Sequence, residues 1–257
     1  MTENAIGAIL TILWWVPILA APFIGSFLGV VVERLPEGEP LVFGRSRCDY
    51  CGHTLAVRDL IPLVSWFAAQ RRCRYCGTPL GWFYPNIEVA ALLVAIWAAL
   101  TISGPMMWVS CGLGWALLTL AVIDIRHLIL PDVITLPLLA GGLVTIFAID
   151  PSMLDQHALA AVLGFGVFWL IATGYRKLRG QEGLGLGDAK LLAAAGAWVS
   201  WQGLPGVVFF GAASALLVVL LRIALGADIG SRRHLPFGPY LCLATWLVWL
   251  YGPLLLG

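Results

Sequence analysis

Long hydrophobic runs separated by short polar segments dominate the chain, and the length of these runs indicates its fold class. A run of roughly 17–25 mostly apolar residues is long enough to cross the hydrocarbon core of a bilayer as an α-helix. About eight such runs are present, at residues 8–32, 86–103, 107–124, 132–149, 156–174, 189–203, 205–225 and 239–256. The pattern predicts an all-α polytopic membrane protein with about eight transmembrane helices. The sixth run is short enough to be a partial or tilted span.

Composition supports the same class. Hydrophobic residues make up 60% of the 257 residues and charged residues only 11%, and the mean hydropathy is +0.92. These values exclude a soluble domain of ordinary composition. The net charge of +1 gives no indication of a nucleic-acid partner, so membrane lipid is the surrounding partner that the composition predicts.

The fifteen Lys and Arg residues all fall in, or within a few residues of, every other segment between the runs, which defines the expected orientation of the chain. Cytoplasmic loops of membrane proteins carry an excess of Lys and Arg, so these segments are expected to face the cytoplasm and both termini to lie outside. No signal peptide is expected, because the first apolar run is longer than the hydrophobic part of one and has Glu3 before it without any basic residue. The basic residues fall within 34–74, at 126, within 176–190, and at 222, 232 and 233.

The one sizeable polar segment, residues 37–85, carries two pairs of cysteines. The pairs are Cys48-x2-Cys51 and Cys73-x2-Cys76, and 21 residues separate them, which is typical of a four-thiolate zinc site with two knuckles. The expected orientation places the segment in the reducing cytoplasm, where a metal is favoured over disulfides. A redox Cys-x2-Cys pair is the alternative, but the βαβ pattern that usually accompanies one is missing. The sequence therefore predicts a small domain held together by structural zinc.

Three parts of the chain are expected from these features. Residues 1–36 form a first transmembrane span, residues 37–85 the cytoplasmic four-Cys zinc domain, and residues 86–257 a seven-span membrane domain. The remaining cysteines, Cys111 and Cys242, fall within spans and are interpreted as ordinary buried apolar residues.

Asp124 lies where a helix dipole disfavours a carboxylate. The third run is expected to reach the cytoplasm at its C-terminal end, and Asp124 lies in that last turn, at the negative end of the dipole. Capping of its own helix therefore does not explain this residue, although an ion pair with Arg126 remains an alternative. Asp132 differs, because it follows Pro131 at the start of the next run and is interpreted as the N-cap of that helix.

Asp188 lies in the glycine-rich turn Gly183-Leu184-Gly185-Leu186-Gly187-Asp188, at the expected cytoplasmic start of the sixth run. Glycines allow close backbone approach or a positive φ, and an ionisable group at the edge of a membrane is a candidate functional residue. The alternative is that Asp188 is simply the N-cap of the following helix. Glu88, expected in the first turn of the second run, is open to two interpretations: a favourable interaction with the helix dipole or a role in a site.

The expected topology delivers Asp124 and Asp188 to the same face at similar depth, although 64 residues separate them. Two neighbouring carboxylates can share one proton, so one can activate a water as general base while the protonated partner polarises a carbonyl. The sequence offers no metal-ligand cluster near the membrane and no Ser/His/Asp arrangement as a substitute. Two non-enzymatic classes remain as alternatives. One is a transporter, whose charges are expected near the midplane, and the other is a zinc-bearing assembly protein of a pilus or secretion system.

The chain resembles the bacterial prepilin peptidases, the type IV leader peptidase family of GxGD-type membrane aspartic proteases, over nearly its whole length. The matching motifs are Gly25-Ser26-Phe27-Leu28, the two Cys pairs with Ile61-Pro62-Leu63-Val64-Ser65-Trp66 between them, Arg72-Cys73, Tyr84-Pro85 with Glu88, Asp124 with Leu130-Pro131-Asp132, Gly185-Leu186-Gly187-Asp188 with Lys190, and Pro236-Phe237-Gly238-Pro239-Tyr240.

The resemblance implies an aspartic endopeptidase of the bacterial inner membrane in which Asp124 and Asp188 are catalytic. Its substrates would be type IV prepilins or type II secretion pseudopilins, cleaved on the cytoplasmic side between a basic leader ending in Gly and the hydrophobic helix. Many members also methylate the new N-terminus with S-adenosylmethionine, so the resemblance implies this cofactor as well. The chain departs from the family at Gly29 and Leu60, where Asn is usual, and both positions lie in or beside the part associated with methyl transfer.

Overall fold

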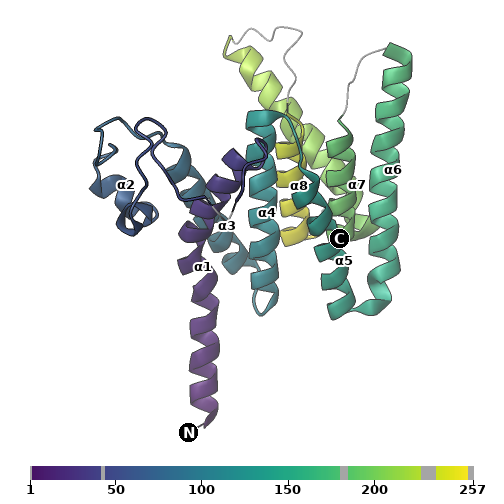
Figure 1. Cartoon of the computed structure of the whole chain (residues 1–257). Coiled ribbons are helices and arrows are strands. Elements are labelled where there is room, and N and C mark those ends of the chain that lie inside the picture. The colour runs from purple at the N-terminus through teal and green to yellow at the C-terminus, as the bar shows by residue number, and fades with distance from the viewer. Residues whose placement is uncertain (1, 42–43, 180–184, 227–235, 254–257) are drawn as a thin grey trace. The chain divides into compact units, whose positions relative to one another are not determined.

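The computed structural model describes residues 2–41, 44–179, 185–226 and 236–253, without the side chains of residues 2–14 and 179. The chain divides into two compact units, Met1–Trp115 and Ala116–Gly257, with the boundary inside one helix. The elements are α1 (Thr2–Arg34), η1 (Val57–Leu60), α2 (Val64–Ala68), α3 (Phe83–Thr101), α4 (Met106–His127), α5 (Asp132–Ile149), η2 (Pro151–Met153), α6 (Leu154–Arg179), α7 (Leu186–Ala224) and α8 (Gly238–Tyr251) (Figure 1).

The prediction of an all-helical membrane protein is confirmed, while the number of spans is only approximate. Among the described residues, strand pairing is limited to two isolated bridges, Arg47 with Thr54 and Arg72 with Pro79. Within the part of the chain that the structure describes, six helices are long and apolar enough to cross a membrane. The sixth and seventh predicted runs belong to one 39-residue helix, α7, and the eighth run contains the 14-residue α8.

Ser200 divides α7 into two arms. Its backbone has φ 65 and ψ 174, which no helix tolerates, so the chain changes direction at this residue. In Figure 1 the second arm returns toward the end of the bundle at which the first arm begins. The arms, residues 186–199 and 201–224, correspond to the runs predicted at 189–203 and 205–225. The sequence thus located both segments, but it placed the break at the Gly203 and Pro205 region instead of at Ser200.

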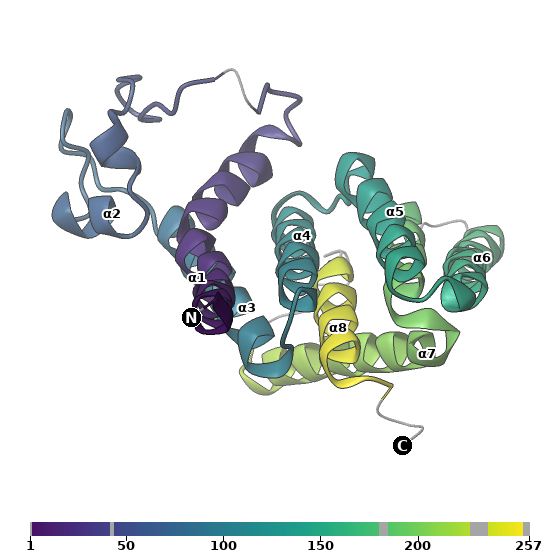
Figure 2. The ribbon, with the colours of Figure 1, turned by 90° about the horizontal axis from the view of Figure 1, so that it is seen from below.

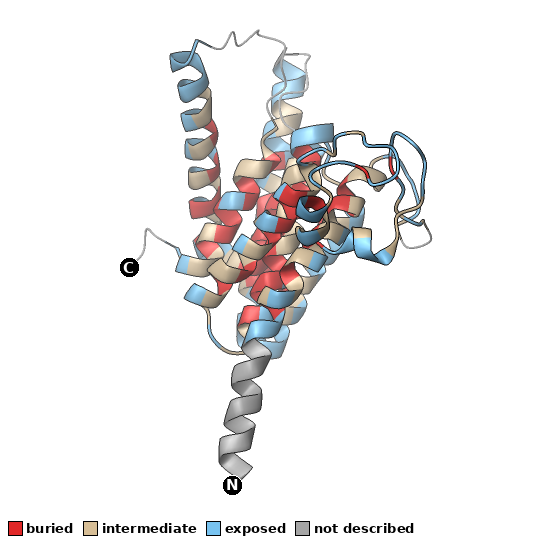
Figure 3. Ribbon diagram, turned by 90° about the vertical axis from the view of Figure 1, so that its left-hand side faces the viewer, coloured by how far each residue is buried: buried red, intermediate tan, exposed pale blue. Residues whose placement is uncertain are grey.

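The first unit is built on close packing of α1 against α3. A Cβ added to Gly25 would lie 2.6 Å from the Cα of Glu88, so only glycine allows the two backbones this approach. Small residues at such contacts are typical of membrane helix pairs. The long connection between α1 and α3 carries η1 and α2, and Figure 3 shows that most of this connection is exposed.

The second unit is organised around α7. Its first arm packs on α6, where a Cβ added to Gly164 would lie 2.8 Å from the carbonyl oxygen of Leu192. The same arm packs on α5 through the Trp198 indole N–H, which donates to the Leu138 carbonyl at 2.8 Å. The second arm packs on α8, and a Cβ added to Gly211 would lie 3.2 Å from Leu241. Figure 2 shows α8 lying against this second arm.

Four segment ends of the second unit meet at one end of its bundle: the end of α4 and the starts of α5, α7 and α8 (Figure 1). Contacts between residues distant in sequence hold them there, since Gly238 reaches Asp124 and Lys190 reaches Asp132. These ends carry both aspartates that the sequence selects as catalytic.

Candidate catalytic and metal sites

Asp124 is buried in the last turns of α4, with 6% of its surface exposed. Its Oδ2 accepts a hydrogen bond from the backbone N–H of Gly238 at 2.9 Å. Gly238 is the first residue of α8, so the carboxylate lies at the positive end of that helix dipole. The negative end of its own helix therefore does not decide its environment. The N-terminus of α8 stabilises this buried acid.

Asp188 lies in the first turn of α7, but it is not the N-cap. The N-cap is Gly185, three residues earlier, and the Gly185 backbone N–H donates a hydrogen bond to the Asp188 carboxylate. This contact is the half of a capping box in which the third helical residue reaches back to the first free N–H. The interpretation of Asp188 as an N-cap is therefore wrong, and its carboxylate still faces its own helix N-terminus. Gly183 and Leu184 of the predicted turn lie outside the described residues.

Asp124 and Asp188 lie close enough for their charges to interact directly. The buried Cys242 thiol of α8 is within electrostatic reach of both carboxylates, so α4, α7 and α8 all border the same point. Each carboxylate has one backbone N–H donor, and each keeps oxygen lone pairs for a further partner. Two carboxyl groups in this arrangement can hold one proton between them, one acting as base and the other as acid.

Leu130 fills the space between the two glycine-containing motifs. A Cβ added to Gly187 would lie 3.1 Å from the Cβ of Leu130, and one added to Gly238 would lie 3.2 Å from its Cδ2. The latter Cβ would also lie 2.7 Å from Oδ2 of Asp124. Glycine is thus required at these positions because a side chain would be too close to its neighbours, and not because the backbone has a positive φ. Sequence reasoning missed this role of Leu130, which only the triplet Leu130-Pro131-Asp132 hinted at.

The capping prediction made for Asp132 is also wrong. The N-cap of α5 is Pro131, so Asp132 is the first helical residue and its side chain is free to point elsewhere. Both of its carboxylate oxygens lie 2.7 Å from Nζ of Lys190, in the first turns of α7. The ion pair joins two helices, and its two residues lie 58 positions apart in the sequence. Neither hydrophobic periodicity nor local capping rules could have identified this partner.

Glu88 lies in the first unit, in the second turn of α3 and not in its first turn, which contains no acid. The interpretation as a helix-dipole residue is therefore wrong. Its side chain is buried, with 5% exposure, and Oε2 accepts from the backbone N–H of Leu63 at 2.8 Å. Ser26 of α1 also bonds to the carboxylate. Leu63 has a positive φ of 59, so Glu88 holds a strained turn of the connection against the paired helices.

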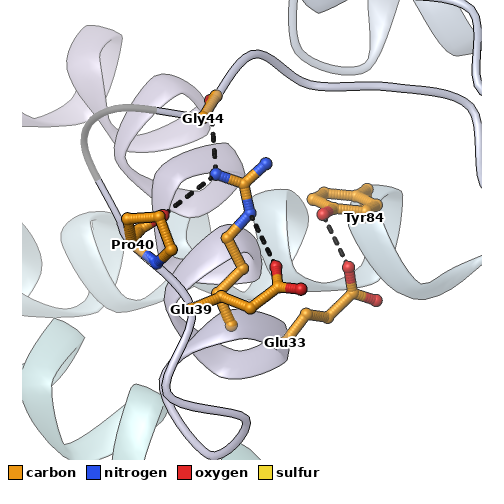
Figure 4. Close-up of polar contacts among 6 residues, drawn as sticks. Glu33, Glu39, Pro40, Gly44 and Tyr84 are labelled. Atoms are coloured by element: carbon orange, nitrogen blue, oxygen red, sulfur yellow. Dashed lines mark hydrogen bonds and ion pairs between the residues drawn. The ribbon is translucent and has the colours of Figure 1, made fainter.

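The end of α1 has its own polar contacts (Figure 4). The guanidinium of Arg34 donates to the carbonyls of Pro40 and Gly44 at 3.3 and 3.2 Å. The hydroxyl of Tyr84 donates to Glu33 at 2.8 Å, and the Tyr84 ring lies where a side chain at position 29 would stand, 2.8 Å from an added Cβ on that glycine. These contacts fix where the connection leaves the membrane helix.

The four cysteines of residues 48–76 form one cluster. One ligand atom from each of Cys48, Cys51, Cys73 and Cys76 lies within 4.8 Å of all the others, and the sulfurs of Cys48 and Cys76 are 3.9 Å apart. A tetrahedral zinc with Zn–S bonds of about 2.3 Å would separate its sulfurs by about 3.8 Å. Hydrogen bonds from Thr78 lower the pKa of the Cys76 thiol to about 6, which favours the thiolate that binds metal. The residues fit a zinc ion.

The two cysteine pairs adopt the same local structure. In each pair the first cysteine N–H donates to the carbonyl five residues on, at His53 and Thr78, and the glycine after the second cysteine donates back to the first. Gly52 has φ 66 and Gly77 has φ 74, a conformation that glycine adopts at little cost. The stacked rings of His53 and Tyr75, 3.7 Å apart, join the two knuckles. Sequence reasoning missed this short repeat, although Cys-Gly occurs in both pairs.

Asp59 ties the second knuckle to the apolar segment between the pairs. It accepts from the Tyr75 hydroxyl at 3.1 Å and from the backbone N–H of Ala56 at 3.2 Å, and it pairs with Arg74 at 3.0 Å. The neighbouring Leu60, one of the two departures from the family, has 42% of its surface exposed. That departure therefore changes a surface position and not a packed one.

Two aspartates close together among membrane helices are the arrangement expected of a membrane aspartic peptidase. The comparisons agree. Residues 19–102 match the bacterial peptidase A24 N-terminal domain, and residues 111–221 match the type IV leader peptidase family. No solved structure matches the chain.

Curated relatives match over almost the whole chain. Those that carry the name prepilin leader peptidase/N-methyltransferase include the following three. The protein of Aeromonas hydrophila is 36% identical, over 89% of this chain and 87% of its own length. That of Burkholderia pseudomallei is 37% identical, over 91% and 85%, and that of Pseudomonas aeruginosa is 35% identical, over 91% and 89%. The chain belongs to the type IV leader peptidase family.

Proposed function

We propose that this chain is a prepilin peptidase that removes the basic leader of type IV prepilins or pseudopilins, with Asp124 and Asp188 as its catalytic pair. One observation carries the assignment of the pair: residues 64 positions apart meet at one end of the second unit, close enough for their charges to interact. Membership of the family and the names of the relatives support the substrate class. The transporter and assembly-protein alternatives leave the pairing of the two acids unexplained.

The chemistry follows from two carboxyl groups that share one proton. The ionised member takes a proton from a water molecule as the water oxygen attacks the carbonyl carbon of the scissile peptide. The protonated member gives its proton to the carbonyl oxygen, which forms a neutral tetrahedral intermediate. Collapse of that intermediate breaks the C–N bond: the amine leaves with the proton first taken from water, and the carboxylate that gave its proton takes one back from a hydroxyl of the intermediate, so the pair again holds one proton. The two products are the free leader acid and a new N-terminal amine.

The backbone donors decide how the two acids are held during this cycle. The Gly238 N–H on Asp124 and the Gly185 N–H on Asp188 favour the ionised form of each carboxylate. They also fix the carboxylate planes, since an N–H at a helix start cannot rotate away.

The cofactors follow from the same family membership. Cys48, Cys51, Cys73 and Cys76 would hold one structural zinc ion, which would stabilise the exposed connection between α1 and α3. The relatives' names include N-methyltransferase, so we also propose that the new N-terminus is methylated with S-adenosylmethionine as methyl donor. We place the enzyme in the bacterial inner membrane with the zinc domain and the aspartates on the cytoplasmic side, because every Lys and Arg is expected to face that side.

The test uses the purified full-length chain and a synthetic prepilin fragment with its leader and apolar helix, analysed by mass spectrometry for leader loss and for an added methyl group. Asp124→Asn and Asp188→Asn should each lower cleavage on the order of a thousandfold or more, and the double variant should be no worse than either, as for groups that act as a unit. Membrane insertion and zinc content should not change.

Asp155→Asn is the matched control, an exposed acid in the first turn of α6, and it should cleave like the unsubstituted chain. Unchanged processing by Asp188→Asn would reject the catalytic pair and leave the non-enzymatic alternatives. Loss of the added methyl group with cleavage intact would reject only the methyl transfer.

A further inference from the structure

The Asp132–Lys190 ion pair lies directly beside the candidate catalytic pair, and catalysis as proposed makes no use of it. Both oxygens of Asp132 lie 2.7 Å from the Lys190 ammonium. The side chains are 53% and 34% exposed, and exposed ion pairs contribute little to folding stability. A contribution to stability therefore does not explain so close a contact.

The ion pair joins two segments that carry the residues of the catalytic site. Lys190 follows Asp188 by two residues in the first turns of one helix, so their backbones move together. Asp132 follows Leu130 by two residues, and Leu130 contacts both Gly187 and Gly238. The contact between Asp132 and Lys190 thus fixes the start of α5, with Leu130, against the start of α7, with Asp188.

The connection between α4 and α5 is short, residues 128–131, and Leu128 in it has a positive φ of 55, a conformation that costs energy for a residue with a branched side chain. Asp124 lies on α4, before this connection, and Asp188 lies on α7, beyond it. The ion pair adds a contact between the start of α5 and the start of α7, where the contacts of Leu130 also lie.

We propose that Asp132 and Lys190 are positioning residues, whose ion pair sets the separation of Asp124 and Asp188 and keeps Leu130 between Gly187 and Gly238. The inference rests on the proposed peptidase function. A misplacement of about 1 Å at a catalytic group can cost about a hundredfold in rate, so a weak surface contact can be essential for turnover. Lys190 acts through Asp132, and neither side chain touches the substrate.

The test is a double-mutant cycle on the full-length chain with the prepilin fragment, measuring kcat and KM separately. Lys190→Met and Asp132→Ala should each lower kcat about tenfold to a hundredfold with KM within about twofold. The double variant should be no worse than the poorer single variant. Lys190→Arg, which keeps the charge and the reach, should recover most of the loss. Asp132→Asn should lie between, because its amide oxygen still accepts a hydrogen bond from Lys190.

Lys177→Met and Asp155→Asn are matched controls, because they make the same kinds of change at exposed positions of α6. The thermal unfolding midpoint should be the same for every variant, as expected for an exposed pair. If the losses add in the double variant, or if the loss appears in KM alone, Lys190 contacts the substrate. Either result would overturn the proposed positioning role of the ion pair. Single variants as active as the controls would overturn it too. An unsubstituted chain that does not cleave rejects the proposed function instead, so the two failures are distinguishable.

Discussion

At the scale of single residues, the candidate site depends on backbone groups that come from helix starts. Asp124 is buried at the end of α4 and would be unfavourable there on dipole grounds alone. The N–H of Gly238, at the start of α8, provides the positive end that its own helix lacks. Asp188 receives the corresponding contact from Gly185 of its own helix. Both acids are thus held at helix N-termini, one from another helix and one from its own.

Gly238→Ala tests this use of a helix start. An added Cβ at position 238 would lie 2.7 Å from the Asp124 carboxylate and 3.2 Å from Leu130, so one of these groups must move. We expect a loss of cleavage of about tenfold to a hundredfold, with zinc content unchanged. Gly166→Ala is the control, because a Cβ there meets nothing within 4 Å and alanine favours a helix by roughly 1 kcal/mol. Equal cleavage by both variants would contradict the close contact at Asp124.

The acids of the candidate site could be selected from the sequence, but their partners could not. Asp124 stood out from its unfavourable place in a helix and Asp188 from its glycine-rich turn. Asp132 was instead assigned to a local helix start, and Glu88 was left open between a helix-dipole interaction and a role in a site, because dipole and capping rules only consider neighbours in sequence. Their actual partners, Lys190 and Leu63, lie 58 and 25 residues away, and no periodicity reports such a pairing.

At the scale of elements, the zinc knuckles show how much a short motif determines. Spacing alone predicted that four cysteines would come together, and their sulfurs lie within 4.8 Å of one another. The glycine after each pair makes this possible, because the backbone there has φ near 70. Hydrophobic runs were equally informative for the membrane helices, except at Ser200, where a residue without a turn signature breaks α7.

Zinc binding should depend on these glycines. Gly77→Ala places an alanine at φ 74, a conformation that costs an L-residue about 1–2 kcal/mol, so zinc affinity should fall roughly tenfold, measured by competition with a chelator. Cys73→Ser should lose the metal. Gly81→Ala is the control, because its backbone has no positive φ and an added Cβ meets nothing within 4 Å. A full zinc content in Cys73→Ser would overturn the four-cysteine site.

At the scale of the whole molecule, charge and hydropathy predicted a multi-pass membrane protein, and the helices agree. Among the residues that the structure describes, six helices have the length and hydropathy of a span. The division into two units, Met1–Trp115 and Ala116–Gly257, was beyond prediction, because local patterns do not show which distant helices pack together. The orientation of the chain in the membrane, unlike the helix packing, is predicted from which loops carry basic residues.

The proposed orientation leads to the last prediction, because the proposed substrate carries its basic leader on the cytoplasmic side. α5 has 18 residues and therefore spans about 27 Å. It starts beside the site at Asp132 and ends next to the acidic turn at Asp150, so the turn at Ser152 lies at the far end of the second unit. A compartment-sensitive reporter inserted into the full chain at Ser152 should report the outside, and one inserted after Lys177 or after Gly52 should report the cytoplasm. A cytoplasmic signal at Ser152 would turn Asp124 and Asp188 to the outer face, where a basic leader that remains inside could not reach them.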